Sequence, residues 1–254
     1  MNFEYLVFDL DRTLLNDDRK ISDFTFKALT KLRENGKKII YNTARGYGET
    51  MNVIRRFQPD YTICGGGSLI LNNRFKTLFK SPIPPEFTNK LIKFFKKYNI
   101  HFTVQTYDKG YSDDQSLVRD TFIKVDYSFY TNDFAYKIDI YFEHYDDLLE
   151  KIKKEAAKYF LQLTPYSRPG CYRLNNIGDS KYNGLFELCK IEKISLAQVI
   201  SFGDDINDLE MLLKSGKGVL VENNNAHYQG NDIDICDTNN NDGPAKYLLK
   251  LFNL

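Results

Sequence analysis

The chain has 254 residues, which at roughly 150 residues per domain leaves open one large domain or two small ones. Its 42% hydrophobic residues supply a core and exclude global disorder. The net charge of +1 gives no electrostatic case for nucleic acid or an anionic membrane as the main partner. No apolar run approaches the roughly 20 residues that span a bilayer, and the N-terminus lacks the regions of a signal peptide, so we expect a cytoplasmic protein.

The first 80 residues alternate between strand and helix patterns. Tyr5-Leu6-Val7-Phe8 is a short continuous apolar run, typical of a strand buried on both faces. Apolar residues then repeat at helical spacing between the candidate N-cap Ser22 and the stop Gly36. This order predicts a parallel α/β sheet, with strands at 5–8, 38–41 and 61–64 and helices at 23–35 and 49–57.

The alternation stops at Ser81-Pro82-Ile83-Pro84-Pro85, a stiff connection that holds three of the seven prolines. An α+β unit follows, and we expect Pro169-Gly170 to mark its exit. The alternation within 136–142 predicts a strand with one packed face and one partly wet face. The predicted elements are a helix around 87–98, strands at 101–107, 136–142 and 160–164, and a helix at 145–159.

The first pattern then resumes, with helices at 180–190, 209–214 and 244–252 and strands at 197–202 and 219–221. We therefore predict an α/β fold with a Rossmann-like parallel-sheet core. This core is discontinuous, comprises residues 1–81 and 172–254, and is interrupted by an inserted α+β cap domain at 82–171. Cysteines are scattered and form no C-x-x-C pair, which predicts buried reduced thiols at Cys64, Cys171, Cys189 and Cys236.

Paired carboxylates follow two of the predicted buried strands. Asp9 and Asp11 follow the first strand, and Asp204, Asp205 and Asp208 follow the strand that ends at 202. Ligands of parallel α/β sheets bind beyond the carboxyl ends of the strands. If the two strands are neighbours, so much negative charge in a small volume requires a hard cation. Mg²⁺ is the expected ion because the implied ligands are all oxygen atoms.

Four motifs in chain order resemble those of the haloacid dehalogenase superfamily. They are Phe8-Asp9-Leu10-Asp11-Arg12-Thr13-Leu14, Asn42-Thr43-Ala44-Arg45, Gly178-Asp179-Ser180-Lys181 and Gly203-Asp204-Asp205-Ile206-Asn207-Asp208, with further matches at Asn225-Ala226 and Asp242-Gly243. The long insert between the second and third motifs resembles the Cof-type subgroup of magnesium-dependent phosphatases. The resemblance covers essentially the whole chain.

The resemblance implies a Mg²⁺-dependent phosphomonoester hydrolase that acts on a small phosphorylated metabolite, with a sugar phosphate as the expected class. It implies that Asp9 is the nucleophile that forms an aspartyl-phosphate and that Asp11 is the general acid and base. It also implies that Mg²⁺ is held by the Asp9 carboxylate, the Asp11 backbone carbonyl and Asp204. Lys181 would be a second cation and a catalytic group, and Thr43 and Asn207 would bind phosphoryl oxygens. Asp208, with Asp205, would orient the metal shell.

Several other residues have more than one possible role. Arg45 either contacts substrate or braces the cap, and Thr13 either hydrogen-bonds its own loop or touches substrate. Cys64-Gly65-Gly66-Gly67-Ser68 lacks the G-K-[ST] of a P-loop, so it is interpreted as a tight turn. Tyrosines of the insert, at 107, 111, 127 and 130, belong either to its core or to a ligand-facing surface.

Alternative functions are a phosphomutase with the same aspartyl-phosphate chemistry and a non-catalytic sugar-phosphate sensor. A dehalogenase is disfavoured because Asp11 and the metal would have no role in halide displacement. The chain departs from its relatives at Ala44, at Gly65-Gly66 and within 221–226, which leaves the substrate open. We expect a monomer or weak dimer.

Overall fold

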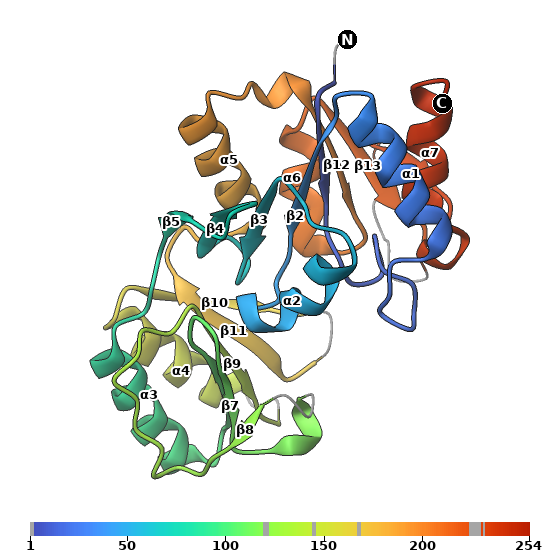
Figure 1. Ribbon diagram of the computed structural model, residues 1–254. Coiled ribbons are helices and arrows are strands. Elements are labelled where there is room, and N and C mark those ends of the chain that lie inside the picture. The colour runs from blue at the N-terminus through green and yellow to red at the C-terminus, as the bar shows by residue number, and fades with distance from the viewer. Residues whose placement is uncertain (1–2, 119–121, 144–145, 167–168, 224–229, 231) are drawn as a thin grey trace. The chain divides into compact units, whose positions relative to one another are not determined.

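The computed structural model describes residues 3–118, 122–143, 146–166, 169–223, 230 and 232–254 (Figure 1). Its contacts divide the chain into two units. The first comprises Met1–Ala44, Thr50–Phe79 and Ser180–Leu254, and the second comprises Arg45–Glu49 and Lys80–Asp179. Within the described ranges no helix combines the length and the apolar character needed to cross a membrane.

An eight-stranded sheet runs through the first unit. Its strands are β1 (Tyr5–Phe8), β2 (Lys38–Asn42), β3 (Tyr61–Cys64), β4 (Leu69–Asn72), β5 (Thr77–Lys80), β12 (Val199–Gly203), β13 (Lys217–Val221) and β14 (Asp234–Cys236). The spatial order is β14-β13-β12-β1-β2-β3-β4-β5. Neighbours from β14 to β3 are parallel, and β4 turns back antiparallel to β3. The predicted parallel α/β fold is therefore confirmed.

Helices cover both faces of this sheet, as Figure 1 shows. They are α1 (Asp23–Glu34), α2 (Tyr47–Arg56), α5 (Lys181–Glu192), α6 (Leu209–Lys214) and α7 (Gly243–Leu251). One core cluster joins Phe8 to Leu29 of α1 and Leu248 of α7, and the other joins Val7 to Leu185 of α5. The central strand β1 is thus buried on both faces, which explains its continuous apolar sequence. Short 3₁₀ turns lie at Gln115–Leu117, Leu196–Gln198, Ile206–Asp208 and Asn239–Asn241.

The described residues of the second unit form a six-stranded sheet and two α-helices. These are β6 (His101–Gln105), β7 (Gly110–Ser112), β8 (Ile123–Lys124), β9 (Lys137–Tyr141), β10 (Leu161–Pro165), β11 (Cys171–Asn176), α3 (Pro85–Tyr98) and α4 (Asp146–Ala157). The strand order is β10-β11-β9-β6-β7-β8. A separate core packs Phe102, Ile138 and Leu174 of the sheet against Phe95 of α3 and Ile152 of α4.

The structure corrects the expected exit from this unit. Pro169-Gly170 lies in the turn between β10 and β11, where Gly170 has a φ of +74°. Because β11 pairs with both β10 and β9, residues 172–179 belong to the second unit. The boundary between the units lies between Asp179 and Ser180, whereas the sequence placed it between 171 and 172.

The polar residues of β9 are also not where the alternation predicted them. Lys137 and Asp139, expected on a partly wet face, are buried. Their ammonium and carboxylate groups form an ion pair at 2.9 Å, which makes that burial tolerable. Tyr111 and Tyr127 pack against the core of the second unit.

All four cysteines are buried free thiols, as predicted. Cys64, Cys189 and Cys236 lie in the first unit, and Cys171 lies in the second. Burial raises the pKa of the Cys189 thiol to about 11 and that of Cys236 to about 12.

Candidate active site

Asp9 and Asp204 come together because their strands are neighbours. Phe8 of β1 and Phe202 of β12 are register partners in a parallel pair, and their rings stack with centroids 5.0 Å apart. The Asp9 backbone N–H donates to the Phe202 carbonyl at 3.0 Å. Both strands therefore end at the same edge of the sheet, and the carboxylates that follow them meet there.

The loop after β1 folds back on itself. Backbone amides of Leu14 and Leu15 donate to the carbonyls of Asp9 and Leu10, at 3.3 and 2.9 Å. Asp11, half-buried, forms an isolated bridge with Leu15. The buried hydroxyl of Thr13 donates to Oδ1 of Asp204 at 3.2 Å, so Thr13 ties this loop to the neighbouring one.

The loop after β12 holds Asp208 in place. Oδ2 of Asp208 accepts from the backbone amides of Asp204 and Asp205, at 3.3 Å each. Asp205 in turn caps the 3₁₀ turn by accepting from the Ile206 amide at 2.7 Å. Gly203 is required here, because a Cβ at that position would lie 2.3 Å from Cβ of Asp208. Asn207 is half-buried within the same turn.

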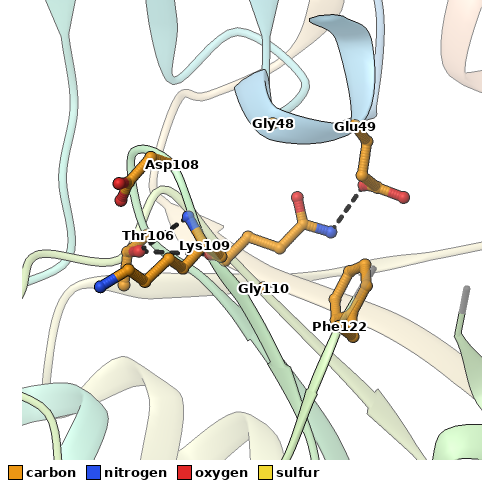
Figure 2. A pocket seen from close by; sticks show the side chains of 8 residues that line it. Gly48, Glu49, Thr106, Asp108, Lys109, Gly110 and Phe122 are labelled. Atoms are coloured by element: carbon orange, nitrogen blue, oxygen red, sulfur yellow. Dashed lines mark hydrogen bonds between the residues drawn. The ribbon is translucent and has the colours of Figure 1, made fainter. Parts of the chain in front are cut away.

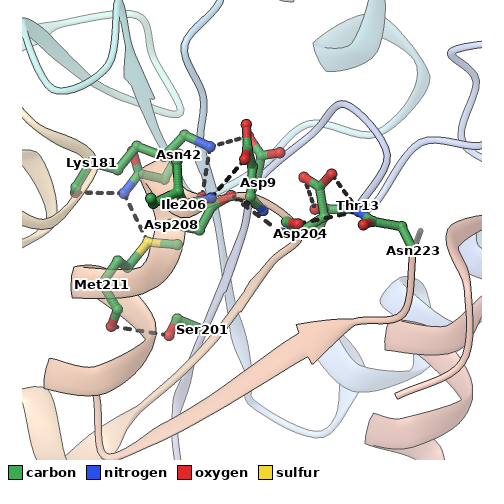
Figure 3. Close-up of polar contacts among 11 residues, drawn as sticks. Asp9, Thr13, Asn42, Lys181, Ser201, Asp204, Ile206, Asp208, Met211 and Asn223 are labelled. Carbon is green, nitrogen blue, oxygen red and sulfur yellow. Dashed lines mark hydrogen bonds and ion pairs between the residues drawn. The ribbon is translucent and has the colours of Figure 1, made fainter. Parts of the chain in front are cut away.

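Lys181 joins the ends of these elements (Figure 3). It is the first residue of α5, whose N-cap Ser180 accepts from the Asn183 amide at 3.0 Å. Its Nζ lies 2.7 Å from Oδ1 of Asp9 and 2.6 Å from Oδ1 of Asp208. All three side chains are buried, so the lysine is not the solvated helix-start residue that its sequence position alone would suggest.

The second motif and the glycine turn pack against each other. The Thr43 amide donates to the Ile63 carbonyl, and the Gly66 amide donates to the Thr43 carbonyl, both at 2.9 Å. Thr43 is buried. The turn meets the start of α5: a Cβ on Gly67, which has a φ of +107°, would lie 2.2 Å from the Ser180 carbonyl oxygen. The predicted tight turn thus leads from β3 into β4. Arg45 is buried and belongs to the second unit.

The site has an excess of buried negative charge. Three carboxylates face one ammonium group, which leaves two negative charges when all four groups are ionised. Burial, reinforced by the neighbouring carboxylates, raises the pKa of Asp9 well above its ordinary value and that of Asp204 to about 6. Although burial disfavours its charge, the carboxylates of Asp208 and Asp9 hold the pKa of Lys181 above its ordinary value.

The donor set fits a hard divalent cation. Among the described residues, Asp9, Asp204 and Asp208 each offer a carboxylate oxygen, and these atoms lie within 4.8 Å of one another. All are oxygen ligands, the kind that Mg²⁺ prefers. A divalent ion would cancel the two surplus negative charges. The structure groups Asp208, predicted as an orienting residue, with the predicted ligands Asp9 and Asp204.

A small cavity of about 90 Å³ lies in the second unit (Figure 2). Glu49 accepts a hydrogen bond from Nε2 of Gln105 at 2.8 Å beside it. Cavities that enclose a whole metabolite typically measure 300 Å³ or more. This one is therefore too small to hold a phosphorylated metabolite. Its lining residues are Gly48, Glu49, Gln105, Thr106, Asp108, Lys109, Gly110 and Phe122.

Residues 6–248 match the family model of haloacid dehalogenase-like hydrolases. The chain belongs to this family. The match confirms the superfamily and the Cof-type subgroup predicted from the motifs, and with them a hydrolytic enzyme.

Relatives match over nearly their whole lengths. A putative phosphatase of Buchnera aphidicola is 23% identical, over 98% of this chain and 97% of its own. A 5-amino-6-(5-phospho-D-ribitylamino)uracil phosphatase of Bacillus subtilis is 22% identical, over 97% and 94%. A crystal structure of a haloacid dehalogenase-like hydrolase from Bacteroides thetaiotaomicron superposes with a TM-score of 0.85 at 19% identity, over 99% of this chain and 100% of its own.

Sequence reasoning missed one residue of the site. Nδ2 of Asn223 donates to Oδ2 of Asp204 at 2.8 Å and to its carbonyl at 3.2 Å. Asn223 lies in the stretch after β13 that the sequence marked as a departure from relatives. A polar residue just past a buried parallel strand was the available signal. The matched pair Asn225-Ala226 lies outside the described residues.

Proposed function

We propose that this hydrolase is a Mg²⁺-dependent phosphomonoesterase that acts on a small phosphorylated metabolite through an aspartyl-phosphate on Asp9. One observation carries the proposal: the Lys181 ammonium sits between the buried carboxylates of Asp9 and Asp208, at 2.7 and 2.6 Å. This arrangement supports the proposal because it holds a carboxylate beside a cation that could compensate the charge of a phosphoryl group. A sugar phosphate is the proposed substrate class, and the phosphoribityl substrate named for the Bacillus subtilis relative supports it.

In the first step an Asp9 oxygen forms a bond to phosphorus while the ester bond between phosphorus and oxygen breaks. Asp11 gives its proton to the departing alkoxide. In the second step water forms the new bond to phosphorus, the bond between phosphorus and Asp9 breaks, and Asp11 takes the proton from the water. The products are an alcohol and inorganic phosphate, and both Asp9 and Asp11 return to their starting states.

The other residues hold the transferring group. Lys181 binds phosphoryl oxygens as a cation, while Thr43 and Asn207 donate hydrogen bonds to them. Mg²⁺, held by the Asp9 carboxylate, the Asp11 backbone carbonyl and Asp204, would neutralise the repulsion between the nucleophile and the phosphate. Asp208 and Asp205 orient the shell around the ion, a role supported by the backbone hydrogen bonds that fix Asp208. Arg45 stays a candidate either for contact with the substrate or for bracing the cap domain.

The test is hydrolysis of p-nitrophenyl phosphate and of a panel of sugar phosphates, with Mg²⁺ and with a chelator. Asp9→Asn should abolish turnover, because the amide is no nucleophile, while leaving the unfolding transition in place. Asp23→Asn, the same change at an exposed residue of α1, should retain full activity. Substantial turnover by Asp9→Asn would refute the nucleophile. Transfer of phosphate to a second hydroxyl in place of release into water would identify a mutase.

A further inference from the structure

The sheet of the second unit has one apolar face and one face that carries buried polar residues. Phe102, Ile138 and Leu174 belong to the core that α3 and α4 cover. Alternate residues of the same strands must point to the opposite face. Six of these alternate residues are polar and buried: Thr103 and Gln105 on β6, Lys137 and Asp139 on β9, Arg173 and Asn175 on β11.

The β9 carboxylate on this polar face, that of Asp139, already has its partners. Oδ2 of Asp139 pairs with Nζ of Lys137 at 2.9 Å and accepts from the Thr103 hydroxyl at 3.5 Å. Oδ1 of Asp139 accepts from the Tyr166 hydroxyl at 2.8 Å. The negative charge of Asp139 is therefore matched by the positive charge of Lys137.

Arg173 has no such partner. It stands opposite Asp139 in the register between β11 and β9, and it is only 3% exposed. Its Nε and Nη1 atoms are buried without a hydrogen-bond partner, and no ion pair joins its guanidinium to a carboxylate in the described part of the chain. The Tyr166 ring faces the cation, with its centroid 5.7 Å away, and the Asp179 carboxylate lies near enough for Arg173 to lower its pKa.

Buried guanidinium N–H groups without acceptors are costly, because nothing replaces the hydrogen bonds to water that they have lost. On the strands of this face, Lys137 and Asp139 cancel each other and Arg173 adds a positive charge. Two carboxylates lie beside the strands: Glu49, which accepts from Gln105 at 2.8 Å, and Asp179, which attracts Arg173 without an ion pair to it. The planar fork of guanidinium donors matches the paired oxygens of a phosphate or a carboxylate. An oxyanion would therefore supply the acceptors that Nε and Nη1 of Arg173 lack.

We propose that Arg173 is the anion-binding residue of a site on the polar face of the six-stranded sheet, and that this site takes a phosphate or carboxylate group. The group comes either from a free anion or from a second anionic substituent of the molecule that the enzyme hydrolyses. The second source rests on the proposed phosphatase function, whereas the binding itself does not.

Binding is tested on the full chain without Mg²⁺, with inorganic phosphate as the probe. The Nε–Hε NMR signal of Arg173, assigned by its loss in Arg173→Lys, should shift saturably as phosphate is added. Lys181→Met removes the phosphate-binding cation of the first unit, and the Arg173 signal should respond in that chain as well. In the Lys181→Met background, Arg173→Gln should weaken phosphate binding at least about tenfold, the loss expected for hydrogen bonds to a charged group.

An Arg173 signal that ignores phosphate would overturn the proposal, and that measurement needs no variant to fold. Equal phosphate affinity of Lys181→Met with and without Arg173→Gln would overturn it too. So would an ion pair between Arg173 and Asp179 in solution, which would hold the carboxyl titration of Asp179 below pH 3.8.

Kinetics separate the two sources of the anion. If the anion belongs to the substrate, Arg173→Gln lowers kcat/KM for a hexose bisphosphate at least about tenfold and changes that for the hexose monophosphate less than twofold. If the anion is free, both values change by the same factor while phosphate binding still depends on Arg173. Should the chain hydrolyse no phosphoester, the proposed function fails, and the NMR titration still decides the anion site.

Discussion

Asp179 is a buried acid whose ionisation opposes folding. Only 9% of the residue is exposed, and its Oδ2 is buried without a hydrogen-bond partner. Burial raises its pKa from the ordinary 3.8 to about 6, against the lowering effects of the Ser81 hydroxyl and of Arg173. The folded chain therefore keeps a proton that the unfolded chain releases between pH 3.8 and 6. Stability falls as the pH rises through this window and levels off above about pH 6.

The rise in pKa sets the size of the effect. At about 1.4 kcal/mol for each pH unit, it corresponds to at most about 3 kcal/mol. Residual contact with solvent reduces this, so we expect about 1 to 2 kcal/mol. Asp179→Asn removes the titration. The free energy of unfolding of the variant, relative to wild type, should therefore increase by that amount between pH 4 and pH 7.

Urea denaturation of both chains at each pH measures the difference between their free energies of unfolding. Packing costs of the substitution are the same at every pH, so they do not affect the change in this difference between pH 4 and pH 7. Asp133→Asn, the same change at an exposed position of the second unit, is the control and should leave the pH profile of wild type unchanged. A direct NMR titration of the Asp179 carboxyl should give a midpoint near pH 6. Parallel pH profiles for wild type and Asp179→Asn would refute the reasoning.

Three further outcomes are expected. Lys181→Met leaves two buried carboxylates without their counterion. The free energy of unfolding of this variant, measured in urea at pH 7.5, should therefore fall by about 3 kcal/mol. A loss below about 1 kcal/mol would contradict the buried pairing. Asp204→Asn should raise the Mg²⁺ concentration for half-maximal activity at least about tenfold, and an unaltered titration would exclude it as a ligand. Gly184→Ala places a Cβ 2.7 Å from Cα of Gly67 and should cost about 2 kcal/mol, against almost nothing for Lys190→Ala on the exposed side of α5.

The elements with a strong local signal could be predicted from the sequence. Helix α1 was expected at 23–35 and spans Asp23–Glu34, because Ser22 caps it and Gly36 follows it. Strand β1 was placed correctly because burial on both faces requires an unbroken apolar run. The proximity of Asp9 and Asp204 could be predicted for a second reason: residues that follow adjacent parallel strands lie at the same edge of the sheet.

Other elements carry no such signal. Strand β11 was missed because its buried residues Arg173 and Asn175 are polar, and a run of polar residues resembles a loop until its neighbours are known. Strand β8 has two residues, and β14 is a three-residue strand at the edge of its sheet. The position of Asn223 just past β13 marks it as a candidate, but its contact with Asp204 also depends on the path of the chain after that strand. The cytoplasmic location and the oligomeric state stay predictions.

The distribution of cysteines gives each unit its own natural reporter of local opening. Cys171 is the single thiol of the second unit, while the other three belong to the first. A buried thiol reacts with an alkylating reagent only when its surroundings open, so the rate of labelling at each cysteine reports the local opening equilibrium. Mass spectrometry of labelled peptides can therefore measure the opening of the two units separately in the native chain, with no engineered probe.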